Sequence, residues 1–337
     1  MWLLYGANGY TGELIAREAV RRGDRPILAG RDAAKIEPLA RELGCEWRAF
    51  DLTRPDLSGV QLVLHCAGPF LHTSAPMVNA CLAAGVHYLD ITGEIVVFES
   101  VFRRHDDAVA RGVALIPGVG FDVVPTDCLA AMLHKRMPDA TELWLAFSSK
   151  SGVSRGTLKT MLEGMPHGGA IRENGKIRRV PQMFDVREIP YASGPRISMT
   201  IPWGDISTAY RSTKIPNIRV YSSQSRGALK QLKRIKPLLP LLKFKPVQKI
   251  AQRWASKTAG PSAETRASAR VELWGRARNA NNDEVSLTMS VAEGYHFTML
   301  SALAAVERVL QSELKGALTP SMAFGSEFVL FIEGTQA

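Results

Sequence analysis

Residues 2–12 read Trp2-Leu3-Leu4-Tyr5-Gly6-Ala7-Asn8-Gly9-Tyr10-Thr11-Gly12, and this stretch decides the fold. The apolar run before Gly6 is typical of a buried strand, and helical spacing of apolar residues begins directly after Gly12. Glycines at intervals of three allow the sharp turn between the two. A helix that begins there directs free N–H groups and the positive end of its dipole toward a bound pyrophosphate. The stretch therefore predicts the first βα turn of a dinucleotide-binding fold.

The same rhythm of short strands and helices continues to about residue 124. Further strands are expected at 25–30, 45–50, 61–66, 86–91 and 113–116, with helices near 77–84 and 96–110. Six strands that alternate with helices predict an α/β fold with a Rossmann-type, doubly wound parallel sheet. Ligands of such sheets bind outside the carboxyl ends of the strands, so candidate residues are those that follow a strand.

The residue after the second strand indicates which cofactor is used. Arg31 stands where proteins that bind NAD carry an acidic residue for the ribose 2′-hydroxyl. An arginine suits a 2′-phosphate, with Lys35 as a second cation, so NADPH is predicted. Asp51 is expected to accept a hydrogen bond from the adenine amine. The other predicted cofactor contacts are Gly6, Ala7, Asn8, Gly9, Tyr10, Thr11, Gly30, Cys66, Ala67, Gly68, Pro69, Phe70 and Gly118.

Beyond residue 124 the pattern changes to alternating strands separated by glycine and proline. This predicts an α+β domain with a mostly antiparallel sheet, followed by a long helix at 295–314 and an apolar tail. The expected domains are a dinucleotide-binding domain at 1–124, a substrate and closure domain at 125–292, and a C-terminal helix and tail at 293–337. The last part is expected to pack back on the first domain.

The composition excludes several classes of protein. The chain has 337 residues, 46% of them hydrophobic, which is typical of a globular protein rather than a disordered one. Its four cysteines form no Cys-x-x-Cys pair, so neither a metal site nor a disulfide framework is expected. No apolar run is long enough to span a membrane, and no signal peptide is expected. A cytoplasmic location is predicted, with association at a membrane surface left open.

One segment carries the positive charge of the chain. The formal net charge is +10, yet no acidic residue lies between Asp205 and Glu264, an interval with thirteen lysines and arginines. Within it, residues 229–254 combine many leucines with Trp254 and three prolines, which predicts short helical pieces. A solvated basic face is the simplest interpretation, but the leucines favour an interfacial amphipathic lid over a substrate pocket. Nucleic acid is disfavoured because no known binding module is present.

Several motifs together resemble the saccharopine dehydrogenase-like superfamily. They are Gly6-Ala7-Asn8-Gly9-Tyr10-Thr11-Gly12, Cys66-Ala67-Gly68-Pro69-Phe70, Tyr88-Leu89-Asp90-Ile91-Thr92-Gly93-Glu94 and Gly120-Phe121-Asp122-Val123-Val124-Pro125-Thr126-Asp127. Three downstream blocks, Ser154-Arg155-Gly156-Thr157, Ile201-Pro202-Trp203-Gly204-Asp205 and Ile215-Pro216-Asn217-Ile218, are similar to the branch with bacterial trans-acting enoyl reductases. Those enzymes act on lipid-linked unsaturated acyl chains. The resemblance implies NADPH in a Rossmann domain and a second domain that closes over the nicotinamide.

Hydride transfer also requires a group that supplies a proton or polarises the acceptor. The candidate catalytic residues after the fourth to sixth strands are His72, Asp90, Glu94 and Asp122. For each of them a structural role is the alternative, as a helix-start residue or as a loop-fixing hydrogen-bond acceptor.

Residues of the second domain are expected to contact the substrate. Ser154 and Arg155 begin a helix and suit an anionic or carbonyl group, whereas Trp203 and Tyr210 suit an apolar pocket. Tyr210 and Lys214 also form a Tyr-xxx-Lys pair like that of short-chain dehydrogenases. Because the nearby Pro216 argues against a helix there, the pair is interpreted as coincidental.

Three hypotheses follow from these features. The first is an NADPH-dependent reductase of an enoyl, carbonyl or imine group in a hydrophobic substrate, with a lipid-linked one left open. The second is an imine reductase of an amino-acid-type substrate, which would need a pocket ringed with arginines. The third is a non-catalytic dinucleotide sensor or membrane-associated scaffold. A homodimer is left open.

Overall fold

The computed structural model describes residues 1–149, 151–255 and 260–337, and the chain divides into two compact units. Unit 1 comprises Met1–Val124 and Tyr295–Ile332, and unit 2 comprises Pro125–Gly294 and Glu333–Ala337. The long C-terminal helix thus belongs to the same unit as the glycine-rich turn. None of the described helices is long and apolar enough to cross a membrane.

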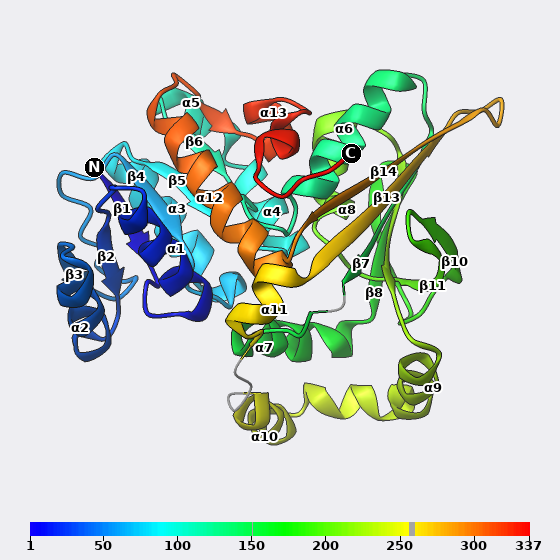
Figure 1. Ribbon diagram of the computed structural model, residues 1–337, viewed down its shortest axis with the longest axis horizontal. Coiled ribbons are helices and arrows are strands. Elements are labelled where there is room, and N and C mark those ends of the chain that lie inside the picture. The colour runs from blue at the N-terminus through cyan, green and yellow to red at the C-terminus, as the bar shows by residue number, and fades with distance from the viewer. Residues whose placement is uncertain (150, 256–259) are drawn as a thin grey trace. The chain divides into compact units, whose positions relative to one another are not determined.

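A seven-stranded parallel sheet forms the centre of unit 1 (Figure 1, mostly blue to cyan). The strands lie in the order β15 (Gly316–Ala317), β6 (Ala114–Ile116), β5 (His87–Asp90), β4 (Leu62–His65), β1 (Trp2–Tyr5), β2 (Ile27–Gly30) and β3 (Trp47–Ala49). The strand order reverses between β1 and β4, which is the switch point at which dinucleotides bind in such sheets. The central strands are buried along their length, which explains their continuous apolar runs. The predicted fold class is confirmed.

The helices of unit 1 differ from the predicted ones at two places. They are α1 (Tyr10–Arg21), α2 (Ala33–Leu43), α3 (Phe70–Ala84), α4 (Ile95–Phe102), α5 (His105–Ala110), α12 (Gly294–Leu310), α13 (Pro320–Phe324) and the 3-10 turn η3 (Phe328–Phe331). Helix α3 begins well before the predicted start near Met77, because a carboxylate from another loop caps it. The helix predicted at 96–110 is two helices, broken where Arg104 precedes α5 and pairs with Asp107.

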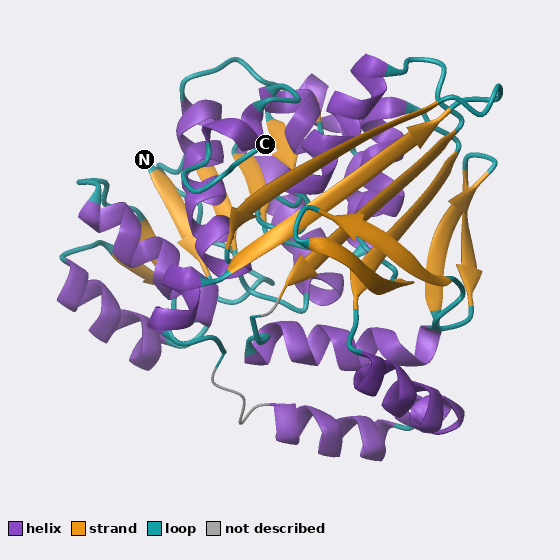
Figure 2. Ribbon diagram, turned by 45° about the vertical axis from the view of Figure 1, so that its right-hand side comes forward, coloured by secondary structure: helices purple, strands orange, loops and turns teal. Residues whose placement is uncertain are grey.

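Unit 2 is built on a second, mixed sheet, whose long strands are prominent in Figure 2. Its main order is β10 (Val186–Tyr191), β11 (Gly194–Thr200), β12 (Asn217–Ser223), β7 (Glu142–Ser149), β13 (Arg270–Arg278) and β14 (Glu284–Ala292), with the hairpin β8 (Gly169–Glu173) and β9 (Lys176–Val180) attached to β12. Every pair is antiparallel except β12 with β7. The prediction of a mostly antiparallel sheet is therefore confirmed.

Unit 2 also contains helices, some of which pack on this sheet while others pack against one another. They are α6 (Val124–Arg136), α7 (Arg155–Gly164), η1 (Met165–His167), α8 (Asp205–Thr213), α9 (Arg226–Ile235), η2 (Lys236–Lys243), α10 (Lys245–Ala255) and α11 (Ala263–Ser268). Helix α6 packs closely on β13, since a Cβ on Gly275 would lie 2.7 Å from a Leu133 methyl. The small residue therefore sets the distance between helix and sheet.

The expectation that Tyr210 and Lys214 lie outside a helix is wrong. Tyr210 lies on α8, and Lys214 ends this helix in a left-handed conformation with φ of 61°. Pro216 lies beyond the end of the helix, a position where proline is common because it cannot continue the helix. The pair still belongs to unit 2 rather than to the Rossmann sheet, and the Tyr210 ring packs against the Arg172 guanidinium at 4.1 Å.

Candidate dinucleotide-binding and catalytic site

Two glycines of the first βα turn are required by the packing of the turn itself. Gly6 has φ of +88°, and a Cβ there would lie 2.8 Å from the Ala67 backbone nitrogen. A Cβ on Gly12 would collide with the Gly6 carbonyl oxygen. These positions hold β1, β4 and α1 close together, and they would need glycine with or without a ligand.

Gly9 is different, because the protein itself gives little reason for a glycine at this position. It precedes α1 with φ of −81°, a value that any residue adopts, and a Cβ there would approach only the Gly6 carbonyl oxygen, at 3.2 Å. The space over Gly9 is open, and it lies at the N-terminus of a helix, where the first N–H groups have no partner within the helix. Such a cradle fits the close approach of a pyrophosphate to backbone.

The end of β2 presents a free cation. Arg31 is exposed, and no carboxylate in the described part of the chain forms an ion pair with it. The Lys35 ammonium lies 2.9 Å from the Asp32 carboxylate, so this lysine has a partner already. The Asn8 side chain reaches the same strand end, where a Cβ on Gly30 would lie 3.3 Å from its oxygen. Arg31 is thus better placed than Lys35 to meet a further anion.

Asp51 is exposed at the loop that follows β3. Its Oδ1 accepts hydrogen bonds from the Thr53 backbone N–H, at 2.8 Å, and from the Thr53 hydroxyl. These hydrogen bonds hold the pKa of the Asp51 carboxyl below its usual range. The carboxylate stabilises its own loop, and the adenine contact remains a prediction.

The last residue of β4, His65, is a buried histidine that the sequence analysis missed. His65 packs between the rings of Tyr5, Phe70 and Tyr88, and its Nε2 lies 3.0 Å from the Thr73 hydroxyl. Burial lowers its pKa to about 3, so the ring is neutral. The sequence does contain a signal for this residue, because His65 is the polar last residue of an otherwise apolar strand. The neighbouring Cys66 is a protonated thiol, because burial raises its pKa.

Asp90 joins the ends of β5 and β6. One carboxylate oxygen accepts hydrogen bonds from the backbone N–H groups of Thr92, at 3.0 Å, and Gly118, at 2.9 Å. The other accepts the Tyr88 hydroxyl proton at 2.7 Å. Burial nevertheless raises the pKa of Asp90 to about 6. This side chain positions two loops of the sheet edge, and a catalytic role for it remains a prediction.

Glu94 caps α3 from the loop after β5. Its two carboxylate oxygens accept hydrogen bonds from the backbone N–H groups of Phe70, at 2.8 Å, and Leu71, at 3.0 Å. A carboxylate at a helix N-terminus satisfies unpaired donors and complements the helix dipole. Glu94 thereby holds the beginning of α3, on whose first turn the exposed His72 lies. Catalytic roles for Glu94 and His72 remain predictions.

Asp122 is the carboxylate at this edge that serves no structural hydrogen bond. Its Oδ2 lies against Gly93, where an added Cβ would be only 2.5 Å away. No hydrogen bond or ion pair of its carboxyl group occurs within the described residues. Burial raises its pKa to about 7. Near neutral pH, Asp122 therefore exists both with and without a proton.

The loop that carries Asp122 is fixed by α12. The Phe121 backbone N–H donates a hydrogen bond to the Thr298 hydroxyl at 2.9 Å, and the Ser301 hydroxyl donates one to the Val119 carbonyl at 2.8 Å. A Cβ on Gly120 would lie 2.8 Å from the Thr298 methyl, so helix and loop approach closely. The C-terminal helix therefore positions a side chain of the predicted catalytic edge.

The predicted substrate residues lie in unit 2, at the start of α7, directly before α8 and on α8. Ser154 caps α7 by accepting a hydrogen bond from the Thr157 backbone N–H at 3.3 Å, and Arg155 is the exposed first residue of that helix. The Trp203 ring packs against Phe147, with ring centres 4.6 Å apart. Tyr210 lies on α8. Substrate contact by these four residues remains a prediction.

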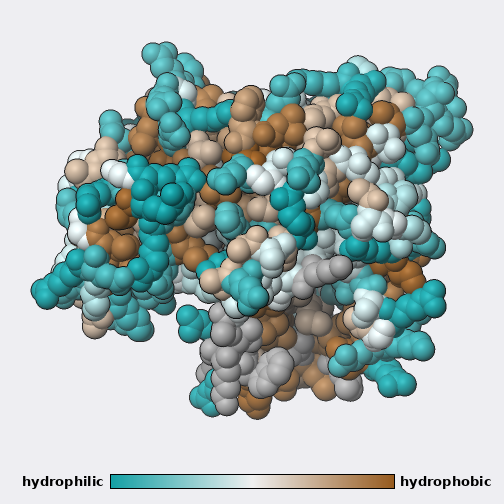
Figure 3. Space-filling view, in the orientation of Figure 1, coloured by the Kyte–Doolittle hydropathy of each residue, from teal (hydrophilic) through white to brown (hydrophobic). Residues whose placement is uncertain are grey.

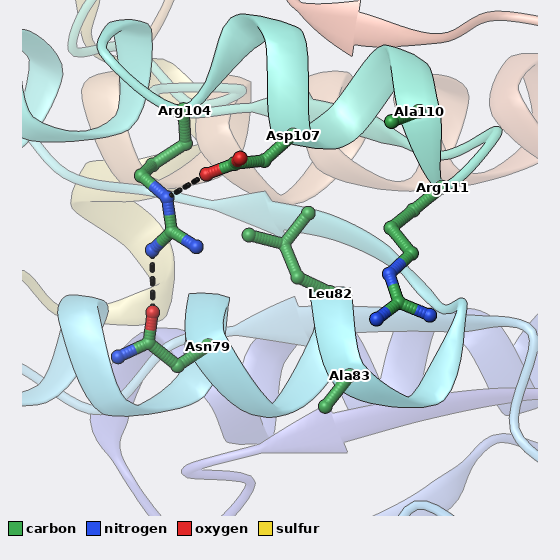
Figure 4. Close-up of a pocket in the computed structure, with 7 residues that line it drawn as sticks. All are labelled: Asn79, Leu82, Ala83, Arg104, Asp107, Ala110 and Arg111. Atoms are coloured by element: carbon green, nitrogen blue, oxygen red, sulfur yellow. Dashed lines mark hydrogen bonds and ion pairs between the residues drawn. The ribbon is translucent and has the colours of Figure 1, made fainter.

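Two surface hollows of unit 1 lie away from this site. One, of about 350 Å³, lies between the C-terminal half of α3 and α5, where Arg104 contacts Asn79 and Asp107 (Figure 4). The other, of about 570 Å³, is lined by residues 55–60 and the end of α3. The end of α3 leads into β5, so both hollows lie toward the amino ends of the strands. Dinucleotides bind at the opposite edge.

Comparison with known proteins agrees with this geometry. Residues 2–116 match the family model described as the saccharopine dehydrogenase NADP binding domain. Trans-acting enoyl reductases of Mycobacterium tuberculosis and Mycobacterium leprae are each 31% identical over 183 residues, which cover 48% of this chain and 44% of theirs. The chain thus spans less than half of the length of these relatives.

Solved structures extend the likeness to the second unit. Saccharopine dehydrogenase (L-Glu forming) of Saccharomyces cerevisiae aligns with 97% of this chain and 95% of its own, at a TM-score of 0.62 and 12% identity. An amine dehydrogenase of Mycobacterium smegmatis aligns with 95% of this chain and 94% of its own, at a TM-score of 0.51 and 11% identity. At these identities the likeness shows the fold alone. Residues 2–116 are therefore similar to the saccharopine dehydrogenase NADP binding domain, and the whole chain has an NAD(P)-dependent dehydrogenase-like fold.

Proposed function

We propose that this protein is an NADPH-dependent reductase of an enoyl, carbonyl or imine group in a hydrophobic substrate. The observation that carries the proposal is the pairing, at one edge of one sheet, of an open glycine cradle with a carboxyl group whose pKa is about 7. The cradle suits a dinucleotide, and the carboxyl group suits the transfer of a proton at neutral pH.

The reaction needs a hydride at one end of the double bond and a proton at the other. The bound nicotinamide would supply the hydride, which carries both electrons. Asp122 would donate the proton from its carboxyl group and be left as a carboxylate, which solvent reprotonates. Asp90 and Glu94 would hold the loops and α3 in place around it, through the hydrogen bonds described above. Neither residue has to change its protonation state for this role.

The names of the mycobacterial relatives support an enoyl substrate, and the apolar and basic character of residues 229–254 supports a lipid-linked one. The second candidate is an imine of an amino-acid type, because one of the two solved structures is a saccharopine dehydrogenase (L-Glu forming). NADPH oxidation should be measured with long-chain enoyl thioesters and, separately, with 2-oxo acids plus amino acids. Turnover of the second set alone would contradict the hydrophobic substrate.

Arg31→Ala is expected to weaken NADPH binding by about 1.5–3 kcal/mol, which is roughly a 10–150-fold rise in Kd, with little effect on NADH. The reason is that the exposed Arg31 guanidinium has no competing carboxylate in the described chain, so it would pair with the 2′-phosphate. Calorimetric titration of both nucleotides measures the difference. Lys35→Ala should have a smaller effect, because Lys35 already pairs with Asp32.

The matched control is Arg41→Ala, which removes another exposed arginine, on α2 and paired with Glu37. It should leave both affinities unchanged. If the wild-type protein binds NADH as tightly as NADPH, the assignment of NADPH is wrong.

A further inference from the structure

The basic segment, defined here as residues 226–255, folds as three short pieces. They are α9, the 3-10 turn η2 and α10, as its prolines predict. The segment packs against other parts of unit 2, with α10 beside α7 and η2 beside η1. Leu229 and Leu239 are buried, so these two leucines fix the segment to its own unit. Other apolar side chains of the segment, among them Phe244 and Ile250, are exposed instead.

An apolar stripe faces solvent along η2 and α10. The exposed fractions are 48% for Leu241, 62% for Phe244, 39% for Val247 and 67% for Ile250. Residues 244, 247 and 250 are spaced by three, so they follow one face of the chain from the start of α10. In Figure 3 hydrophobic atoms are visible on this part of the surface. Single exposed apolar residues are common, whereas a stripe of them marks an interaction site.

The described charges of the basic segment itself have one sign. The described cations Lys230, Lys233, Arg234, Lys236 and Arg253 are all exposed. Among the described residues none of these five forms an ion pair, and no acidic residue occurs from 206 to 263. This contrasts with unit 1, where surface arginines such as Arg17 and Arg41 pair with glutamates of their own helices. The segment is therefore complementary to an anionic surface.

We propose that the basic segment binds the surface of an anionic lipid bilayer. Leu241, Phe244, Val247 and Ile250 would enter the boundary between headgroups and acyl chains, while the cations contact lipid phosphates. Lysine and arginine suit this arrangement, since their aliphatic stems lie along the apolar layer and their charged ends reach the headgroups. The short helical pieces would lie in the plane of the interface. This proposal does not depend on the proposed reaction.

A bilayer fits these observations better than a protein partner does. A specific protein interface combines a central packed pocket with a polar rim that has both hydrogen-bond donors and acceptors. Here the exposed apolar residues form a line rather than a pocket, and the described charged residues of the segment are all cations. Such a pattern gives attraction to any anionic apolar surface without fixing an orientation, which is what a membrane requires.

The test is co-sedimentation of the whole protein with vesicles of phosphatidylcholine, with and without phosphatidylglycerol, at low and high salt. Binding is expected with the anionic vesicles at low salt, and it should weaken strongly at high salt because surface charges are screened. Each cation near the surface should contribute about a fivefold change in partition. Triple substitution Lys230→Gln, Lys233→Gln and Lys236→Gln should therefore lower binding by about 100-fold.

The decisive comparison is between two matched pairs of exposed apolar residues. Phe244→Ser/Ile250→Ser should reduce vesicle binding at least tenfold, whereas Leu330→Ser/Phe331→Ser should not. Leu330 and Phe331 are 42% and 70% exposed, outside the basic segment. All four side chains are exposed, so both variants should keep the wild-type melting temperature.

Three outcomes would overturn the proposal. The first is a wild-type protein that does not bind anionic vesicles at low salt. The second is an equal loss of binding in the two double variants. The third is self-association without lipid that Phe244→Ser/Ile250→Ser abolishes, because the stripe would then be an interface between copies of the chain.

The side chains of Leu238, Leu242 and Trp254, which the sequence analysis includes in the predicted lid, lie outside the described residues.

Discussion

Gly9→Val is expected to abolish nucleotide binding in a protein that still folds. The valine side chain would project into the open space over the beginning of α1, where a pyrophosphate must approach the backbone. The folded protein itself loses little, because Gly9 has φ of −81° and a new Cβ would meet only one carbonyl oxygen, at 3.2 Å. A loss of more than 100-fold in affinity is expected for NADPH and NADH alike, because blocked pyrophosphate contacts remove several charge-assisted hydrogen bonds.

The measurement is calorimetric titration with both nucleotides, together with a thermal melt. Gly9→Ala serves as the first control and should bind more weakly than the wild-type protein but more tightly than Gly9→Val. Gly12→Val is the second control, and it should fail to fold, since its side chain would collide with the Gly6 carbonyl. If folded Gly9→Val binds NADPH with wild-type affinity, the nucleotide does not lie over this turn.

The glycine turn could be predicted from the sequence because everything that forms it is local. A buried strand, three glycines and a helix lie within about twenty consecutive residues, and each has a recognisable pattern. The same holds for the parallel sheet, whose strands are continuous apolar runs. The basic segment was also visible, since proline positions and charge sign are read directly from the sequence.

The rest of the site could not be predicted, because the residues that hold its loops and helices in place lie far away in the sequence. The true start of α3 depends on Glu94, a residue that follows the next strand and accepts hydrogen bonds from Phe70 and Leu71. The loop of Asp122 is held by Thr298, on the C-terminal helix. The sequence offers four candidate catalytic residues, each with a structural role as the alternative. Their hydrogen bonds distinguish them, since Asp90 and Glu94 are engaged by backbone N–H groups and Asp122 is not.

Asp122→Asn is expected to lower the rate of substrate reduction by about 10²–10⁴-fold, the usual size of general acid catalysis, without weakening NADPH binding. The wild-type rate should fall as the pH rises through about 7, because Asp122 must carry a proton to donate one. The residual rate of the variant should lack this decline. Asp106→Asn, which changes an exposed aspartate on α5, is the matched control and should keep both the rate and the pH profile.

The same substitution has a second readout that needs no substrate. The pKa of Asp122 is raised from 3.8 to about 7 by burial, so between these values the folded protein binds more protons than the unfolded chain. The contribution of this group to stability is therefore present at low pH and is lost as the pH rises toward 7. Asp122→Asn should be more stable than the wild-type protein above pH 7, and its melting temperature should depend less on pH between about 4 and 7. Asp90, whose pKa is raised to about 6, will leave part of that dependence in place. A variant with the wild-type pH dependence of both melting and rate would exclude Asp122 as the proton donor, and the exposed His72 would then be the next candidate.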